Sequence, residues 1–89
     1  MSGPYQVVLT RVVRKALAKL PKATQHRMQS KIDGLSSNPR PHGAIKLAGH
    51  EKLWRIRLGS YRIVYEIDDP RRIVIILIVA HRRESYRGL

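Results

Sequence analysis

The sequence predicts a small α+β domain in which one strand and two helices precede three antiparallel strands. Three observations support this prediction. Apolar residues recur at helical spacing only in the first part of the chain, between residues 12 and 35. Two runs of alternating polar and apolar residues flank Gly59-Ser60, which is typical of a β-hairpin. A third run, residues 73–79, consists of Ile, Val and Leu alone. The last three strands should form a small twisted sheet.

A strand and a helical hairpin are predicted before residue 36. Residues 5–9 are β-prone, and Thr10 suits a helix N-cap. The first helix carries apolar residues at helical spacing, namely Val12, Val13, Ala16, Leu17 and Leu20. Pro21 either breaks this helix or begins the second, which is predicted for residues 22–35. The inner face of the second helix should contain Met28, Ile32 and Leu35.

The connection from the second helix to the hairpin, residues 36–52, is longer than most. It contains Asn38-Pro39-Arg40-Pro41 and Gly43, which is a loop composition. We expect Ile45 and Leu47 to pack down and order it.

The hairpin, residues 53–67, separates its side chains into two faces because side chains alternate along a strand. The apolar face consists of Trp54, Ile56, Leu58, Tyr61, Ile63, Tyr65 and Ile67. A turn at Gly59-Ser60 pairs Leu58 with Tyr61 and Arg57 with Arg62, so the apolar faces of both strands coincide. The opposite face then carries Arg55, Arg57 and Arg62 within a small area, and Glu66 lies on the same face further along the second strand.

Like charges that face each other across a sheet destabilise it. The arginines on the polar face of the hairpin therefore suggest an anionic ligand, while a solvated basic face is the plainer alternative. The whole chain supports an anionic partner, because 18 Lys and Arg against 6 Asp and Glu give a formal charge of +12. Nucleic acid or an acidic protein fits this charge better than a membrane surface, since the basic residues form no single amphipathic stripe.

The final strand, residues 73–79, is apolar on both faces, so we expect it to be central and covered on both sides. Asp68-Asp69-Pro70-Arg71 forms the turn before it. His81, Arg82 and Tyr86 follow its end, where functional residues concentrate.

Composition narrows the chemistry of this single domain, residues 1–89. The chain has no cysteine, and its four histidines lack metal-ligand spacing, so we expect neither a metal nor another cofactor. A nucleophile triad, a carboxylate pair and a Gly-rich phosphate loop are not recognisable. Arginine, tyrosine and one histidine remain, a set that suits phosphodiester chemistry without a metal.

No signal peptide or membrane span is visible, so a cytoplasmic location is expected.

Three segments together resemble the RelE family of type II toxins: Lys-Leu-Ala-Gly at residues 46–49, Leu-Trp-Arg-Ile-Arg-Leu-Gly-Ser-Tyr-Arg-Ile-Val-Tyr at 53–65, and His-Arg-Arg-Glu-Ser-Tyr-Arg at 81–87. The resemblance implies a RelE-like fold and a ribosome-dependent, metal-independent mRNA endonuclease that inhibits translation. Such toxins cleave mRNA in the ribosomal decoding site by attack of a 2′-hydroxyl on the adjacent phosphate. The resemblance also implies a RelB-type antitoxin, whose acidic or amphipathic segment wraps the toxin. Contact with operator DNA would occur only through the antitoxin complex.

By position, the resemblance matches Arg55 and Arg57 to basic strand residues of the family and Arg62 to the arginine of its Tyr-Arg pair. Arg82 and Tyr86 match the C-terminal arginine and tyrosine. The best-known members have lysine at the positions of Arg55 and Arg57. Because arginine stays protonated, these two residues should orient phosphate and stabilise charge, without acting as a base.

Proton transfer then falls to Tyr86 or His81. A free tyrosine, with a pKa of about 10, is a poor base at neutral pH, although nearby arginines would lower that pKa. A histidine titrates near neutrality without such help, but a strand-end histidine bonded to backbone is an equally good interpretation of His81.

Two other functions fit the sequence. One is a ParE-type poison of DNA gyrase, which would have the same fold and no nuclease activity. The other is a basic RNA-binding accessory protein without toxicity. The three arginines and Tyr86 favour the nuclease, since a gyrase poison needs no group of phosphate-binding side chains.

Overall fold

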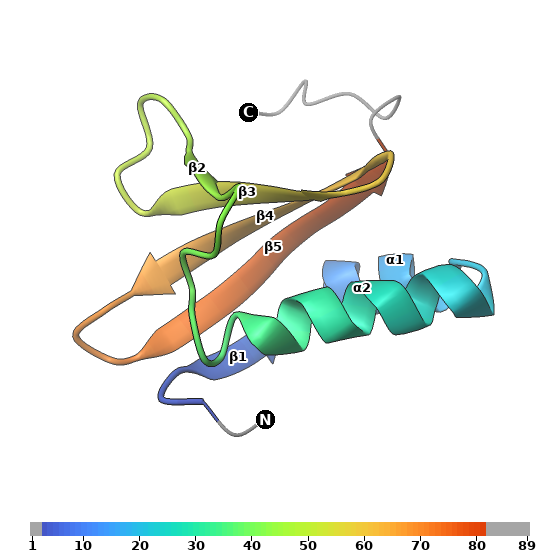
Figure 1. The fold of residues 1–89 in the computed structure, drawn as a ribbon, viewed down its shortest axis with the longest axis horizontal. Coiled ribbons are helices and arrows are strands. Elements are labelled where there is room, and N and C mark those ends of the chain that lie inside the picture. The colour runs from blue at the N-terminus through green and yellow to red at the C-terminus, as the bar shows by residue number, and fades with distance from the viewer. Residues whose placement is uncertain (1–2, 82–89) are drawn as a thin grey trace.

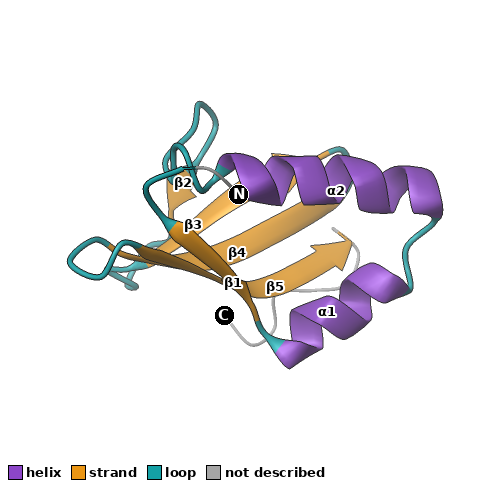
Figure 2. Cartoon of the chain, turned by 90° about the horizontal axis from the view of Figure 1, so that it is seen from below, coloured by secondary structure: helices purple, strands orange, loops and turns teal. Residues whose placement is uncertain are grey.

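Two helices pack on one face of a five-stranded sheet in the computed structural model, which describes residues 3–81 (Figures 1 and 2). The elements are β1 (Gln6–Leu9), α1 (Arg11–Ala18), α2 (Lys22–Gly34), β2 (Ile45–Lys46), β3 (Leu53–Leu58), β4 (Tyr61–Asp68) and β5 (Ile73–His81). The strand order is β1-β5-β4-β3-β2. β1 runs parallel to β5, and the other neighbours are antiparallel. The predicted α+β class and element order are confirmed, with β2 added.

Local signals fix the helix ends. The Val13 N–H donates to Thr10 Oγ1 at 3.2 Å, which confirms Thr10 as the N-cap of α1. Pro21 precedes α2, and its carbonyl accepts from the Gln25 N–H at 2.9 Å. The Gln25 side chain also donates to the Leu17 carbonyl at 2.7 Å, and the same carbonyl accepts from the Leu20 N–H at 3.1 Å just after α1. The Gln25 bond joins the two helices of the hairpin.

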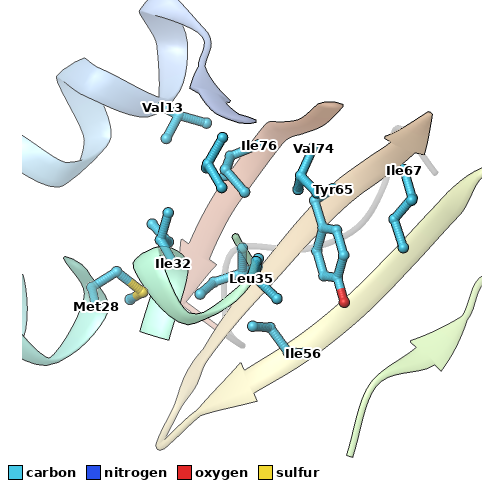
Figure 3. Close-up of a cluster of buried hydrophobic side chains, with 11 residues drawn as sticks. Val13, Met28, Ile32, Leu35, Ile56, Tyr65, Ile67, Val74 and Ile76 are labelled. Atoms are coloured by element: carbon cyan, nitrogen blue, oxygen red, sulfur yellow. The ribbon is translucent and has the colours of Figure 1, made fainter. Parts of the chain in front are cut away.

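The core lies between the helices and the sheet (Figure 3). Met28, Ile32 and Leu35 are fully buried, as the helical spacing predicts. They share a cluster with the apolar face of the hairpin, whose predicted register is observed: Leu58 pairs with Tyr61 and Arg57 with Arg62. The period of two therefore determined which hairpin residues point toward the helices.

The long connection is ordered by polar contacts instead of the expected packing of Ile45. That prediction is wrong for Ile45, which is 49% exposed, while Leu47 is half-buried. The hydroxyl of buried Tyr65 donates to the Pro39 carbonyl at 2.7 Å. Arg40 follows and holds Asp69 with two hydrogen bonds, of 2.7 and 3.3 Å. Residues distant in the chain thus anchor the connection.

Alkaline pH should destabilise the fold through Tyr65. Burial raises the pKa of Tyr65 to about 12, although the charge of nearby Arg40 opposes the shift. Since an unfolded tyrosine ionises near pH 10, stability should be retained below about pH 10 and lost as the pH rises toward 12, by up to roughly 2–3 kcal/mol. Tyr65→Phe should be less stable near pH 7 by about 1 kcal/mol, because the Pro39 carbonyl loses its donor.

Denaturant unfolding of both proteins from pH 7 to 12 checks this prediction. The difference in unfolding free energy between wild type and Tyr65→Phe should shrink and then reverse above pH 10. Every other side chain is common to both proteins, so its contribution cancels in this difference. A difference that stays constant up to pH 12 would contradict the role given to Tyr65.

β5 is an interior strand between β1 and β4, but β4 holds the middle of the sheet, so the predicted central place of β5 is only partly right. Helices cover one face of the described sheet (Figure 2). Val74 and Ile76 are buried on that face, whereas Ile75 and Ile78 are half-buried on the other. The register shifts at Val64/Tyr65, and Leu77 has no Cα partner in β4. This bulge changes which alternate residues of β5 face the helices, from Val74 and Ile76 before it to Val79 after it.

No helix within residues 3–81 has the length and apolar character needed to cross a membrane.

Candidate functional site

Three arginines gather on the sheet face away from the helices, and we call Arg55, Arg57 and Arg62 the arginine cluster. Arg57 of β3 lies directly opposite Arg62 of β4. Arg55 is two residues from Arg57 along β3, which places it on the same face at a distance of about 7 Å. Arg57 is exposed and the other two are half-buried. The face predicted from the sequence is therefore the face observed.

The turn at Gly59-Ser60 creates this arrangement. Gly59 has a φ of +58°, a conformation that two-residue hairpin turns require and that side chains disfavour. A two-residue turn fixes Leu58 opposite Tyr61 and, one pair further along, Arg57 opposite Arg62. A turn with one more residue would shift this pairing.

An apolar floor lies beside the arginine cluster. Val64 is fully buried, faces the same side of the sheet, and is paired with Arg55 on one side and Ile78 on the other. Apolar surroundings lower the local dielectric constant and strengthen the attraction between a guanidinium group and a phosphate. The cluster can therefore bind an anion more strongly than three fully solvated arginines would.

A groove of about 400 Å³ adjoins the cluster at the edge of β3, and we call it the cluster-side groove. Arg55, Arg57 and Ile45 line it together with Lys31 of α2 and His42 of the long connection. Neither Lys31 nor His42 was among the site residues predicted from the sequence. No local pattern could have joined them to the cluster, because only the tertiary fold brings α2 to this edge.

His81 lies on the other side of the sheet from the cluster. It ends β5, pairs with Tyr61 and packs edge-on against the Tyr61 ring, with centroids 5.2 Å apart. Tyr61 belongs to the face that packs on the core. Ala80, which precedes His81 in β5, is the residue that pairs with Arg62. Successive residues of a strand face opposite sides of the sheet, so His81 faces away from Arg62. The structure thus does not bring His81 together with the arginine cluster. Arg82 and Tyr86, the remaining predicted site residues, lie outside the described residues.

The acidic side chains Asp68 and Asp69 lie at the other end of β4 from Arg62. Asp69 binds Arg40 and accepts a 2.6 Å hydrogen bond from the Tyr5 hydroxyl, and hydrogen bonds from these two residues lower the pKa of Asp69. Arg40 also lies over the half-buried Trp54 ring, 5.3 Å from its centroid. Trp54 is thus part of the core margin, in agreement with its predicted place on the apolar face of the hairpin. Arg40 has a structural role at this end of the sheet.

Within residues 3–81 no group of three or more His, Cys, Asp or Glu side chains is placed to hold a metal ion.

Comparisons with known proteins agree on one family. A family model described as ParE toxin of type II toxin-antitoxin system, parDE, matches residues 7–86. Toxin RelG of Mycobacterium tuberculosis is 36% identical, over 94% of this chain and 98% of its own length. Toxin RelE of the same organism is 35% identical, over 94% of this chain and 88% of its own. A solved archaeal RelE–RelB complex from Pyrococcus horikoshii matches with a TM-score of 0.81 and 34% identity, covering 92% of this chain and 99% of that one.

Proposed function

The chain belongs to the RelE/ParE superfamily of type II toxins, and from this membership we propose that it is a ribosome-dependent endoribonuclease that inhibits translation by cleaving mRNA. The reaction is attack of a 2′-hydroxyl on the adjacent phosphate, without a metal. The substrate is mRNA in the ribosomal decoding site, so the toxin acts in the cytoplasm.

The observation that carries this proposal is the pairing of Arg57 with Arg62 beside Arg55 on an apolar floor. The pairing places like charges opposite each other, and an anion bound between them would offset their repulsion. Guanidinium groups bind phosphate oxygens in a bidentate manner and stabilise the negative charge that develops during phosphoryl transfer. A phosphodiester at the cluster would satisfy both requirements.

In the proposed reaction the 2′-oxygen forms a bond to phosphorus, and the bond from phosphorus to the 5′-oxygen breaks. A cyclic phosphate and a free 5′-hydroxyl result. A base must accept the 2′-hydroxyl proton, and an acid must give a proton to the leaving oxygen. Arginines stabilise the phosphate but stay protonated. Because His81 lies on the opposite face of the sheet, we assign proton transfer to Tyr86.

A ParE-type gyrase poison is the second candidate, because the matching family model is that of the ParE toxin. A toxin that acts by binding gyrase requires no phosphate-binding cluster, however. Relatives at 35% and 36% identity are named RelE and RelG. The arginine cluster therefore supports the nuclease as the first candidate.

The partner of the toxin follows from the same family. The Pyrococcus horikoshii structure is a RelE–RelB complex, and a Mycobacterium tuberculosis toxin–antitoxin complex matches with a TM-score of 0.76 and 34% identity. We propose that a RelB-type antitoxin neutralises this chain by wrapping it with an acidic or amphipathic segment. The charge of +12 would speed the encounter with such a segment. Contact with operator DNA would occur only through the complex.

Induction of the toxin in cells, followed by mapping of mRNA ends, tests the proposed function. Growth and translation should stop, cuts should appear within codons at translated positions, and co-expression of the antitoxin should prevent both. A gyrase supercoiling assay run in parallel provides the comparison. Trapped DNA breaks with intact mRNA would establish the ParE-type activity instead, and unchanged growth would reject a toxin altogether.

A further inference from the structure

A second basic groove joins the one beside the arginine cluster. It has a volume of about 560 Å³, lies along α2, and is lined by residues that include His26, Arg27, Lys31, Gly34 and Leu58. We call it the helix-side groove. Lys31 lines both this groove and the cluster-side groove, so the two meet at this side chain. A continuous surface therefore runs from the cluster around the edge of β3 to α2.

The helix-side groove, like the arginine cluster, holds positively charged side chains close together. Arg27 and Lys31 are four residues apart in α2, which makes them neighbours on one helix face. Like charges at this spacing destabilise a helix, as the opposed arginines destabilise the sheet. Among the described residues that line the two grooves, none is acidic. Asp33 of α2 instead accepts a hydrogen bond from Gln29 at 2.9 Å.

Apolar surface accompanies the charges. Leu58 and Pro41 line the helix-side groove, and a Cβ atom added to Gly34 would meet nothing within 4 Å. The groove thus combines cations that suit phosphates with apolar walls and open space that suit bases. Sites for single-stranded nucleic acid combine a basic track for the backbone with surfaces on which bases pack. A peptide that is acidic but has no apolar side chains would use the charges and leave the apolar wall uncovered.

We propose that the RNA strand held at the arginine cluster continues past Lys31 into the helix-side groove, where Arg27 and Lys31 bind its backbone phosphates. This inference rests on the proposed nuclease function and extends it by a second contact region on the same strand. Arg27 is then a positioning residue, because it binds the RNA at a position distant from the phosphate that reacts. The strand would cross the β3 edge next to His42 and Lys31.

Binding of uncleavable RNA by the full-length protein tests the proposal. The probes are 2′-O-methyl RNAs of three and ten nucleotides, measured by fluorescence anisotropy across a salt series. Arg27→Gln should weaken binding of the ten-nucleotide RNA about fivefold near 0.1 M salt and reduce its salt slope by about 0.7, and it should leave the three-nucleotide RNA unchanged. Lys22→Gln is the matched control, since it removes one charge from the same helix outside either groove. Its effect should stay below twofold.

Gly34 offers a second pair of variants. Because the site is open and its φ is not left-handed, Gly34→Glu and Gly34→Gln should both fold with unchanged melting temperatures. Gly34→Glu places a negative charge in the helix-side groove and should weaken the ten-nucleotide RNA more than Gly34→Gln does. Equal affinities of the two RNA lengths, equal effects of Arg27→Gln and Lys22→Gln, or undetectable binding would each overturn the proposal.

These outcomes are separable from those of the proposed function. Codon-specific mRNA cleavage in cells by both wild type and Arg27→Gln, without length-dependent RNA binding, would reject the second contact region and leave the nuclease standing. Length-dependent binding through Arg27, without any mRNA cleavage by the wild type, would reject the nuclease and leave an RNA-binding groove.

Discussion

Arg62→Ala is expected to lower the rate of mRNA cleavage by on the order of 10²–10³-fold. Arg62 lies opposite Arg57 in the cluster and would share with it the charge that develops on the phosphate. Arg62→Lys should recover only part of the rate, because an ammonium group cannot make the bidentate contact of a guanidinium. Cleavage of a defined message on purified ribosomes gives these rates.

Stability should respond very differently to the same change. Removing Arg62 relieves the repulsion across the β3–β4 pair, so the melting temperature should stay the same or rise. Arg71→Ala is the matched control, since Arg71 is an arginine with a 78% exposed side chain that pairs with Asp68 at the far end of β4. It should leave cleavage nearly unchanged. A marked fall in the melting temperature of Arg62→Ala would show that Arg62 is structural.

Tyr86→Ala is expected to abolish most cleavage, and Tyr86→Phe distinguishes between two possible roles of the side chain. The Phe variant keeps the ring and loses only the hydroxyl. If Tyr86 transfers a proton, Phe should be nearly as inactive as Ala, whereas a stacking role would leave most of the activity. Both rates come from the same ribosome assay as those of Arg62. Full activity in both variants would contradict any role of Tyr86 in the reaction.

His81→Gln and a truncation complete this test. Since His81 packs on Tyr61 away from the arginine cluster, His81→Gln should retain cleavage, and a large loss would move proton transfer to His81. Deleting residues 84–89 should abolish cleavage and leave a folded protein, because the buried apolar residues of the described core lie between Val7 and Ile76. Melting temperature and circular dichroism check that the truncated chain folds.

Neighbours along the chain are enough to define several features of this protein. Thr10 as an N-cap, the buried face of α2 and the hairpin register could all be predicted, because capping, helical periodicity and strand alternation act over a few residues. The position of the arginine cluster followed from the same alternation and the two-residue turn. Much of the candidate site was therefore predictable before the fold was known.

Features that join distant segments depend on the tertiary fold. The parallel pairing of β1 with β5 and the Tyr65 bond to Pro39 have no counterpart in any local pattern. The same is true of Lys31, which reaches the groove beside Arg55 because α2 packs across the sheet. The bulge at Leu77 could not be recognised from the sequence, because it lies within an uninterrupted apolar run. Periodicity specifies which face of a helix or strand is buried. Which other helix or strand packs against that face depends on the free energy of the whole core.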